Sequence, residues 1–107
     1  MTYRVVMTDV ASKELDRAVE YVRQRGAPMA ARRWSSQLRA HIKTLARHPE
    51  RCPLAPESEL FDQPFRELLF GAGNRGTYRI IFMIKEEFVV VIHVRHGSML
   101  PFGAEED

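Results

Sequence analysis

At 107 residues the chain fits one domain, over residues 1–107, that can bury a hydrophobic core without disulfides or a metal ion. Its single cysteine, Cys52, excludes an internal disulfide, no Cys or His residues have the spacing of a zinc site, and no cofactor is expected. The formal net charge is only +2, and no apolar run approaches the roughly 18 residues of a membrane span, so we expect a soluble, cytoplasmic protein without a membrane partner.

The chain is expected to begin with a short strand over residues 3–7, which leads into a helix capped by Asp9. Apolar residues then recur at helical spacing and predict one buried stripe. Gly26 breaks this helix, and Pro28 suits the first turn of the next helix. The predicted stripe consists of Ala11, Leu15, Ala18, Val19 and Val22.

A second helix is predicted from Pro28 to Arg47, because Pro49 pushes the residue before it out of the helical conformation. Its buried stripe has the same three- and four-residue spacing. The residues of this stripe are Ala31, Trp34, Leu38, Ile42 and Leu45.

The opposite side of the second helix is basic, and residues 28–48 contain no acid. Residues 1–48 carry ten Lys and Arg against four Asp and Glu, a net charge of +6, whereas residues 49–107 carry six against ten, a net charge of −4. This asymmetry favours a polyanionic partner, either a nucleic acid or an acidic protein, and a merely solvated basic face is the alternative. The predicted partner-binding residues are Arg32, Arg39, Lys43 and Arg47.

Residues 49–64 contain four prolines and no clear period, so we expect a long proline-rich loop. Three strands follow the loop, and residues 98–107 form an irregular acidic tail. The β-α-α-β-β-β order predicts a two-layer α+β domain, in which a helical hairpin packs on a small antiparallel sheet. The three strands are predicted at 65–70, 77–84 and 88–96, with connections at 71–76 and 85–87.

The turn at residues 85–87 sets the expected register of the last two strands. If all three residues belong to the turn, Ile84 pairs with Phe88, and alternate side chains of both strands face the helices. The helix-facing residues are then Tyr78, Ile80 and Phe82, opposite Val94, Ile92 and Val90.

The other face of these strands gathers cations. Arg79 lies opposite His93 in this register, Arg95 shares their face, and Arg66 or Glu67 of the neighbouring strand joins them. Arginine binds phosphate through two parallel hydrogen bonds, and histidine moves protons near neutral pH. The pattern predicts a phosphodiester site. The alternative is that the arginines pair with Glu67 or with acids of the tail.

Five short motifs support a family assignment, and they occur in order along nearly the whole chain. They are Tyr3-Arg4-Val5, Arg32-Arg33-Trp34 with Leu38, Arg66-Glu67-Leu68, Tyr78-Arg79-Ile80-Ile81-Phe82 and His93-Val94-Arg95-His96-Gly97. Together they resemble the RelE/ParE superfamily of type II toxin–antitoxin toxins, which includes plasmid stabilisation proteins. The resemblance implies a toxin that arrests bacterial growth, and an antitoxin that wraps it.

The superfamily divides between two mechanisms. RelE-like toxins cut mRNA in the ribosomal A site without a metal ion, and ParE-like toxins poison DNA gyrase. The resemblance implies that Arg79 contacts the scissile phosphate and that His96 is an acid or base, whereas strand parity favours His93. Both histidines stay open. The catalytic candidates are Arg79, Arg95, His93 and His96, and the phosphate-binding candidates are Arg66, Arg79 and Arg95.

The chain also departs from the RelE-like pattern. Arg66 and Glu67 stand where paired lysines are usual, and Gly97, Ser98 and Met99 follow the last strand where an arginine or tyrosine is usual. Three functions stay open: a metal-independent mRNA interferase, a gyrase inhibitor, and a small partner-binding domain without catalytic activity. The phosphate-suited side chains of the last strand favour cleavage slightly. We expect an acidic antitoxin, with ribosome-bound mRNA or gyrase as target, in a homodimer or a toxin–antitoxin hetero-oligomer.

Overall fold

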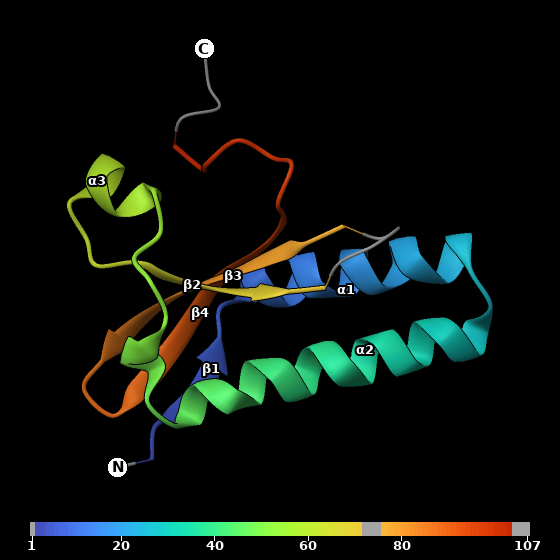
Figure 1. Ribbon diagram of the computed structural model, residues 1–107, viewed down its shortest axis with the longest axis horizontal. Helices are drawn as coiled ribbons and strands as arrows, with labels where there is room; N and C mark the ends of the chain where they lie inside the picture. Colours follow the sequence, from blue (N-terminus) through green and yellow to red (C-terminus); the bar gives the residue numbers. More distant parts are fainter. Residues whose placement is uncertain (1, 72–75, 104–107) are drawn as a thin grey trace.

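The computed structural model describes residues 2–71 and 76–103, whose strands form one sheet in the order β1-β4-β3-β2 (Figure 1). The last three strands in the chain, β2 (Arg66–Phe70), β3 (Tyr78–Lys85) and β4 (Phe88–His96), pair in antiparallel fashion. β1 (Arg4–Met7) lies parallel to β4. The predicted α+β class and the helical hairpin on a sheet are confirmed, with the difference that β1 makes the sheet mixed.

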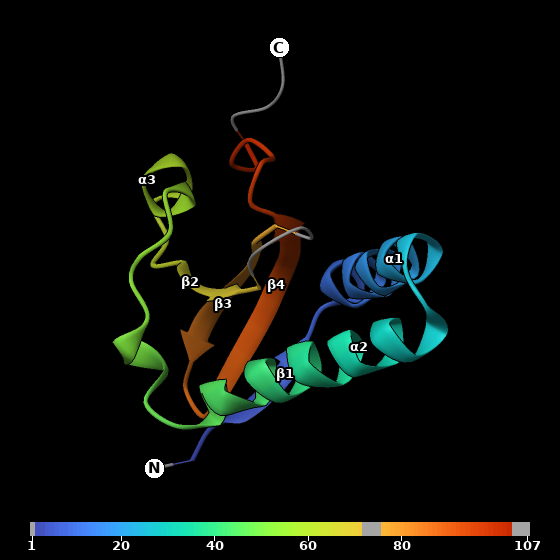
Figure 2. The same ribbon diagram turned by 45° about the vertical axis from the view of Figure 1, so that its right-hand side comes forward.

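Two helices, α1 (Asp9–Arg25) and α2 (Pro28–Lys43), form a hairpin that covers one face of the sheet (Figure 2). The cap of α1 is Thr8 rather than Asp9, because its Oγ1 accepts a hydrogen bond from the Ala11 N–H at 3.1 Å. α2 begins at Pro28 as predicted but ends earlier than expected. A 3₁₀ turn, Thr44–Ala46, follows α2. Arg47, the residue after this turn, has an extended backbone rather than the predicted helical one. Within the described residues, no helix is long and apolar enough to cross a membrane.

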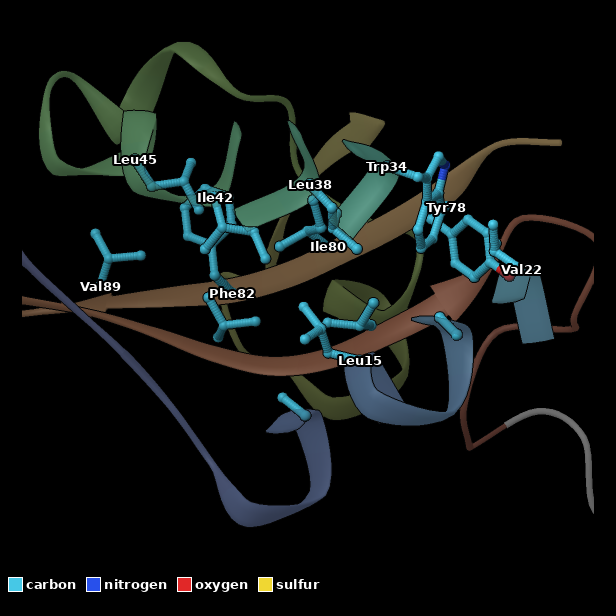
Figure 3. Packing of buried hydrophobic residues seen from close by; sticks show 14 of the residues in the cluster. Leu15, Val22, Trp34, Leu38, Ile42, Leu45, Tyr78, Ile80, Phe82 and Val89 are labelled. Atoms are coloured by element: carbon cyan, nitrogen blue, oxygen red, sulfur yellow. The ribbon is translucent and has the colours of Figure 1, made fainter. Parts of the chain in front are cut away.

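The main core lies between this hairpin and the sheet (Figure 3). Trp34 packs edge-on against Tyr78 and Phe70, with ring centroids 5.3 and 5.7 Å apart. The predicted stripes of both helices are confirmed, except that Val19 is only partly buried. The sheet contributes six buried residues, Tyr78, Ile80, Phe82, Val89, Val91 and Val94.

The opposite face of the sheet, called the far face below, is covered by residues of the predicted proline-rich loop and by the chain after β4. The loop contains a 3₁₀ turn, Pro49–Arg51, and a short helix, α3 (Glu57–Phe61). α3 and the segment after β4 lie beside each other (Figures 1 and 2), and the rings of Phe61 and Phe102 stack at 5.3 Å. A second, smaller core forms here from Ala55, Phe65 and Ile81, with Met83, Ile92 and Phe102 packed against it.

Part of two predicted segments lies outside the described residues. These are residues 72–75 of the glycine-rich connection and residues 104–107 of the acidic tail.

The predicted turn between β3 and β4 is wrong by one residue. Lys85 pairs with Phe88, so the turn has two residues, and Ile84 does not pair with Phe88. Glu86 takes the left-handed conformation that closes this turn, with φ of 57°. The register near the turn therefore shifts by one residue.

A β-bulge shifts the register again further along β4. Phe82 pairs with Val91, whereas its neighbour Ile81 pairs with His93. The residue between them, Ile92, packs against the far-face core. The predicted helix-facing positions of Ile92 and Val90 are wrong, because the one-residue shift at the turn moves both to the far face. The structure places Val89 and Val91 on the helices instead, and Val94 faces the helices as predicted, because the bulge reverses the alternation of side chains beyond it.

Candidate functional site

Arg79 lies on the far face, opposite Arg95 rather than opposite His93. Its guanidinium is held by two carboxylates. Nη1 and Nη2 donate to Oε2 and Oε1 of Glu57 at 2.9 and 2.7 Å, and Nε donates to Oε1 of Glu67 at 2.7 Å. Glu57 comes from α3 and is fully buried, and Arg79 is only 8% exposed. The far face thus contains a buried ion pair that joins α3 to β3.

The charges of this pair stabilise each other. Burial, the largest single influence, would raise the pKa of the Glu57 carboxyl. The hydrogen bonds from Arg79, those from the backbone N–H groups of Glu57 and Phe102, and the positive charge of Arg79 together outweigh burial and hold that pKa below its ordinary value. In return, the hydrogen bonds that Arg79 donates to Glu57 raise the pKa of the Arg79 guanidinium. Both groups are therefore charged at neutral pH.

Arg95 and His93 contact the segment that follows β4. Nη2 of Arg95 donates to the Leu100 carbonyl at 3.0 Å. The His93 ring lies 4.4 Å from the Phe102 ring, centroid to centroid, and the Phe102 N–H donates to Oε2 of Glu57 at 3.2 Å. These contacts fold the chain after β4 over the two arginines.

His93 also reaches across the edge of the sheet to α1. Its Nδ1 lies 3.1 Å from Oε2 of Glu14, and Oε1 of Glu14 accepts a hydrogen bond from the Val94 N–H at 2.8 Å. The last β1 residue that pairs with β4 is Met7, opposite Val91. The Glu14 carboxylate therefore accepts the hydrogen bond of the Val94 N–H, which lies beyond the end of β1 and has no partner on that strand.

His96 lies on the helix-facing side, with its ring edge-on to Tyr78 at 5.1 Å. The Ser98 N–H donates to Nδ1 at 3.1 Å, so the neutral ring carries its proton on Nε2. The ring lines a pocket of about 430 Å³ between α1 and the end of β4. Burial raises the pKa of the Tyr78 hydroxyl in the same pocket. Arg17, Tyr21 and Met99 contribute to its walls.

Arg66 lies apart from the other phosphate-binding candidates. Its Nη1 donates to the carbonyls of Cys52 at 2.6 Å and Glu50 at 3.3 Å. Successive strand residues point to opposite faces, and Glu67 is the one that reaches Arg79. The structure thus brings Arg79 and Arg95 together, places His93 at the sheet edge, and puts His96 and Arg66 elsewhere.

The predicted partner-binding residues are all exposed. Arg32, Arg39 and Lys43 lie on α2, and Arg47 follows the 3₁₀ turn. Nη2 of Arg39 lies 3.7 Å from Oδ1 of Asp16 on α1, a weak ion pair at the protein surface. We refer to Arg32, Arg39, Lys43 and Arg47 as the basic face.

Sequence reasoning missed Glu57, Glu14 and Phe102. A signal for α3 does exist, because Pro56 precedes a turn with two acids, Glu57 and Glu59, as at many helix starts. No local pattern marks Glu14 or Phe102. Among the described residues, no three His, Cys, Asp or Glu side chains gather in a group that could hold a metal ion.

The chain is similar to known proteins in both sequence and fold. Residues 5–101 match the family model described as ParE toxin of type II toxin-antitoxin system, parDE. The fold is similar to a solved structure described as the chromosomal ParDE TA system from P. aeruginosa, with a TM-score of 0.69 and 16% sequence identity. That match covers 89% of this chain and 96% of the other, and at this identity it shows the fold. No curated protein sequence matches the chain.

Proposed function

Because the chain belongs to the ParE family of type II toxin–antitoxin toxins, we propose that it arrests growth by binding DNA gyrase, without chemistry of its own. The observation that carries this proposal is that the Arg79 guanidinium already binds two carboxylates of its own chain. A phosphate clamp needs guanidinium N–H groups directed at the substrate, and those of Arg79 are directed at Glu57 and Glu67. Gyrase is a cytoplasmic target, and we propose that compartment for the toxin.

The distribution of the other candidates supports the same proposal. General acid–base catalysis needs its groups within hydrogen-bond reach of one reacting atom. Arg79 lies on the far face with its donors occupied, and His93 is held at the edge by Glu14. His96 lies on the helix-facing side, where Arg95 but not Arg79 lines the same pocket. The slight preference for cleavage that the sequence suggested is therefore reversed.

The pocket beside His96 supports mRNA cleavage as a second candidate function. Its imidazole, the guanidinium of Arg17 and the phenol of Tyr21 line one cavity, and this set suits a nucleotide. In this candidate His96 acts as acid or base, and Arg95, which also lines the pocket, stabilises charge on the phosphate.

Short induction of the chain in bacteria distinguishes the two mechanisms. The proposal expects covalent gyrase–DNA adducts and a DNA-damage response, with mRNA ends unchanged. Cuts in phase with the ribosomal A site, without such adducts, would replace gyrase inhibition by cleavage. Growth arrest with neither signal would contradict both, and unimpaired growth with folded protein present would leave a partner-binding domain without toxicity.

A type II toxin has an antitoxin partner. We propose that the antitoxin is acidic and contacts the basic face, since four exposed cations there follow one another along a segment without acids. The exposed guanidinium and ammonium groups would speed association with a chain of opposite charge.

A further inference from the structure

The Glu57 carboxylate sits inside a ring of N–H donors. Oε1 accepts from Nη2 of Arg79, while Oε2 accepts from Nη1 of Arg79 and from the backbone N–H of Phe102. The guanidinium fork and a converging amide are the donors that proteins use for oxyanions, both carboxylate and phosphate. The carboxylate is fully buried among them.

The donors are held in place by contacts that do not involve Glu57. Nε of Arg79 is fixed by Glu67, a residue of β2. The Phe102 ring packs against Phe65 at 5.7 Å and His93 at 4.4 Å. The cluster of donors is therefore expected to persist when the Glu57 side chain is shortened.

The carboxylate, by contrast, comes from an element with little support of its own. α3 has five residues, and no side chain caps its N-terminus. Such a short helix is not stable by itself and depends on its tertiary contacts. Its buried anchor to β3 is the same carboxylate that fills the ring of donors.

We propose that Arg79 and the Phe102 N–H form an anion-binding site that the chain fills with its own Glu57 carboxylate. A small oxyanion, such as formate or inorganic phosphate, takes the same place once that carboxylate is removed. The proposal rests on the geometry of the far face and is independent of the toxin's target.

The test is chemical rescue of purified Glu57→Ala. Formate, acetate and phosphate are compared with chloride at constant ionic strength, and thermal unfolding is followed by circular dichroism. We expect a saturable rise of the unfolding midpoint in Glu57→Ala, of about 4 °C or more, because an anion that binds the folded state alone stabilises it. Glu59→Ala removes an exposed acid of the same helix and is the matched control.

The double variant Glu57→Ala/Arg79→Leu identifies the site, since it lacks both the carboxylate and the guanidinium. In this double variant the anions should raise the unfolding midpoint no more than they do in the wild type. An equal response of Glu57→Ala, the wild type and the double variant would overturn the proposal, because all proteins gain some stability from excluded anions such as phosphate.

Refolding covers the case in which Glu57→Ala does not fold in chloride. The folded fraction recovered from urea is then measured with and without formate or phosphate. Recovery that depends on the anion and requires Arg79 supports the proposal. Failure to recover with any of the anions, while Glu57→Gln folds, would contradict it.

Discussion

Glu14 of α1 and His93 of β4 meet at the point where the first strand ends, with Oε2 of the carboxylate 3.1 Å from Nδ1 of the ring. The other carboxylate oxygen accepts the Val94 N–H. A side chain from a helix thus completes the hydrogen bonding of a strand edge, which otherwise presents its amides unpaired. This contact links the helical hairpin to β4, beside the core.

Removal of this carboxylate should destabilise the fold. Glu14→Ala leaves the Val94 N–H without its acceptor and should lower the free energy of unfolding by about 1–3 kcal/mol. Glu14→Gln keeps an amide oxygen for the same N–H and should lose less. Urea denaturation measures both, and Asp16→Ala, which removes an exposed acid of the same helix, is the control. Equal losses in Glu14→Ala and Asp16→Ala would contradict the role of the contact.

The low pKa of Glu57 predicts a stability loss in acid. A carboxyl group whose pKa is lowered by folding adds stability above its unfolded pKa, near 4.5, and loses it as the pH falls toward the folded pKa. The free energy of unfolding should therefore fall more steeply with acidification below pH about 4.5 in the wild type than in Glu57→Gln. Urea denaturation over this range tests it, with Glu59→Gln as control. Parallel pH profiles of wild type and Glu57→Gln would refute the assignment.

Removal of the arginine alone should be worse than removal of both partners. Arg79→Leu leaves the buried Glu57 carboxylate without its counter-ion and should lower the free energy of unfolding by about 3–5 kcal/mol. In Arg79→Leu/Glu57→Leu the unpaired charge is gone, so much of that stability should return. If the double variant were less stable than Arg79→Leu, the stability lost in Arg79→Leu would come from the missing ion pair rather than from the unpaired Glu57 charge.

The sequence predicted what depends on local periodicity. Both helical stripes and the face of Tyr78, Ile80 and Phe82 follow from spacing alone, and the structure has them in place. Register could not be predicted in the same way. The turn lacks the glycine or asparagine that marks a two-residue hairpin, and its left-handed residue is Glu86. The bulge at Ile92 has no sequence signature among neighbouring apolar residues.

The candidate site depended on contacts between distant parts of the chain. Glu57 and Arg79 are separated by 22 positions, and their pairing requires α3 to fold back on the far face. The alternative that Arg79 pairs with Glu67 was visible from the sequence, because both residues lie on neighbouring strands. The pairing of Arg79 with Glu57 could not be predicted, since a loop without periodicity gives no indication of which side chain is buried.

His96 distinguishes the two candidate mechanisms by mutation. Under gyrase inhibition, His96→Gln should leave toxicity unchanged, because no proton transfer is required. Under mRNA cleavage, loss of a general acid or base should slow cleavage about 10²–10⁴-fold. Growth after induction is measured at matched levels of folded protein. A large loss of toxicity in His96→Gln, together with intact folding, would favour cleavage.

Charge reversal on the basic face should weaken recognition of the antitoxin. Arg32→Glu/Lys43→Glu should slow association and flatten its dependence on salt, because complementary surface charges mainly accelerate encounter. Stopped-flow or surface-based kinetics at several salt concentrations measure the effect. Lys85→Glu, which reverses an exposed cation at the end of β3 and outside the basic face, is the control. Unchanged association would show that the face is only solvated.

The position of β4 in the sheet has a consequence for synthesis of the toxin. β4 is the last of the four strands to leave the ribosome, yet it lies between β1 and β3 and supplies three core valines. β1, made first, has no strand beside it until then. A nascent or truncated chain that lacks β4 can therefore pair only β2 with β3 and cannot close the core, and toxicity should begin only once translation has passed this strand.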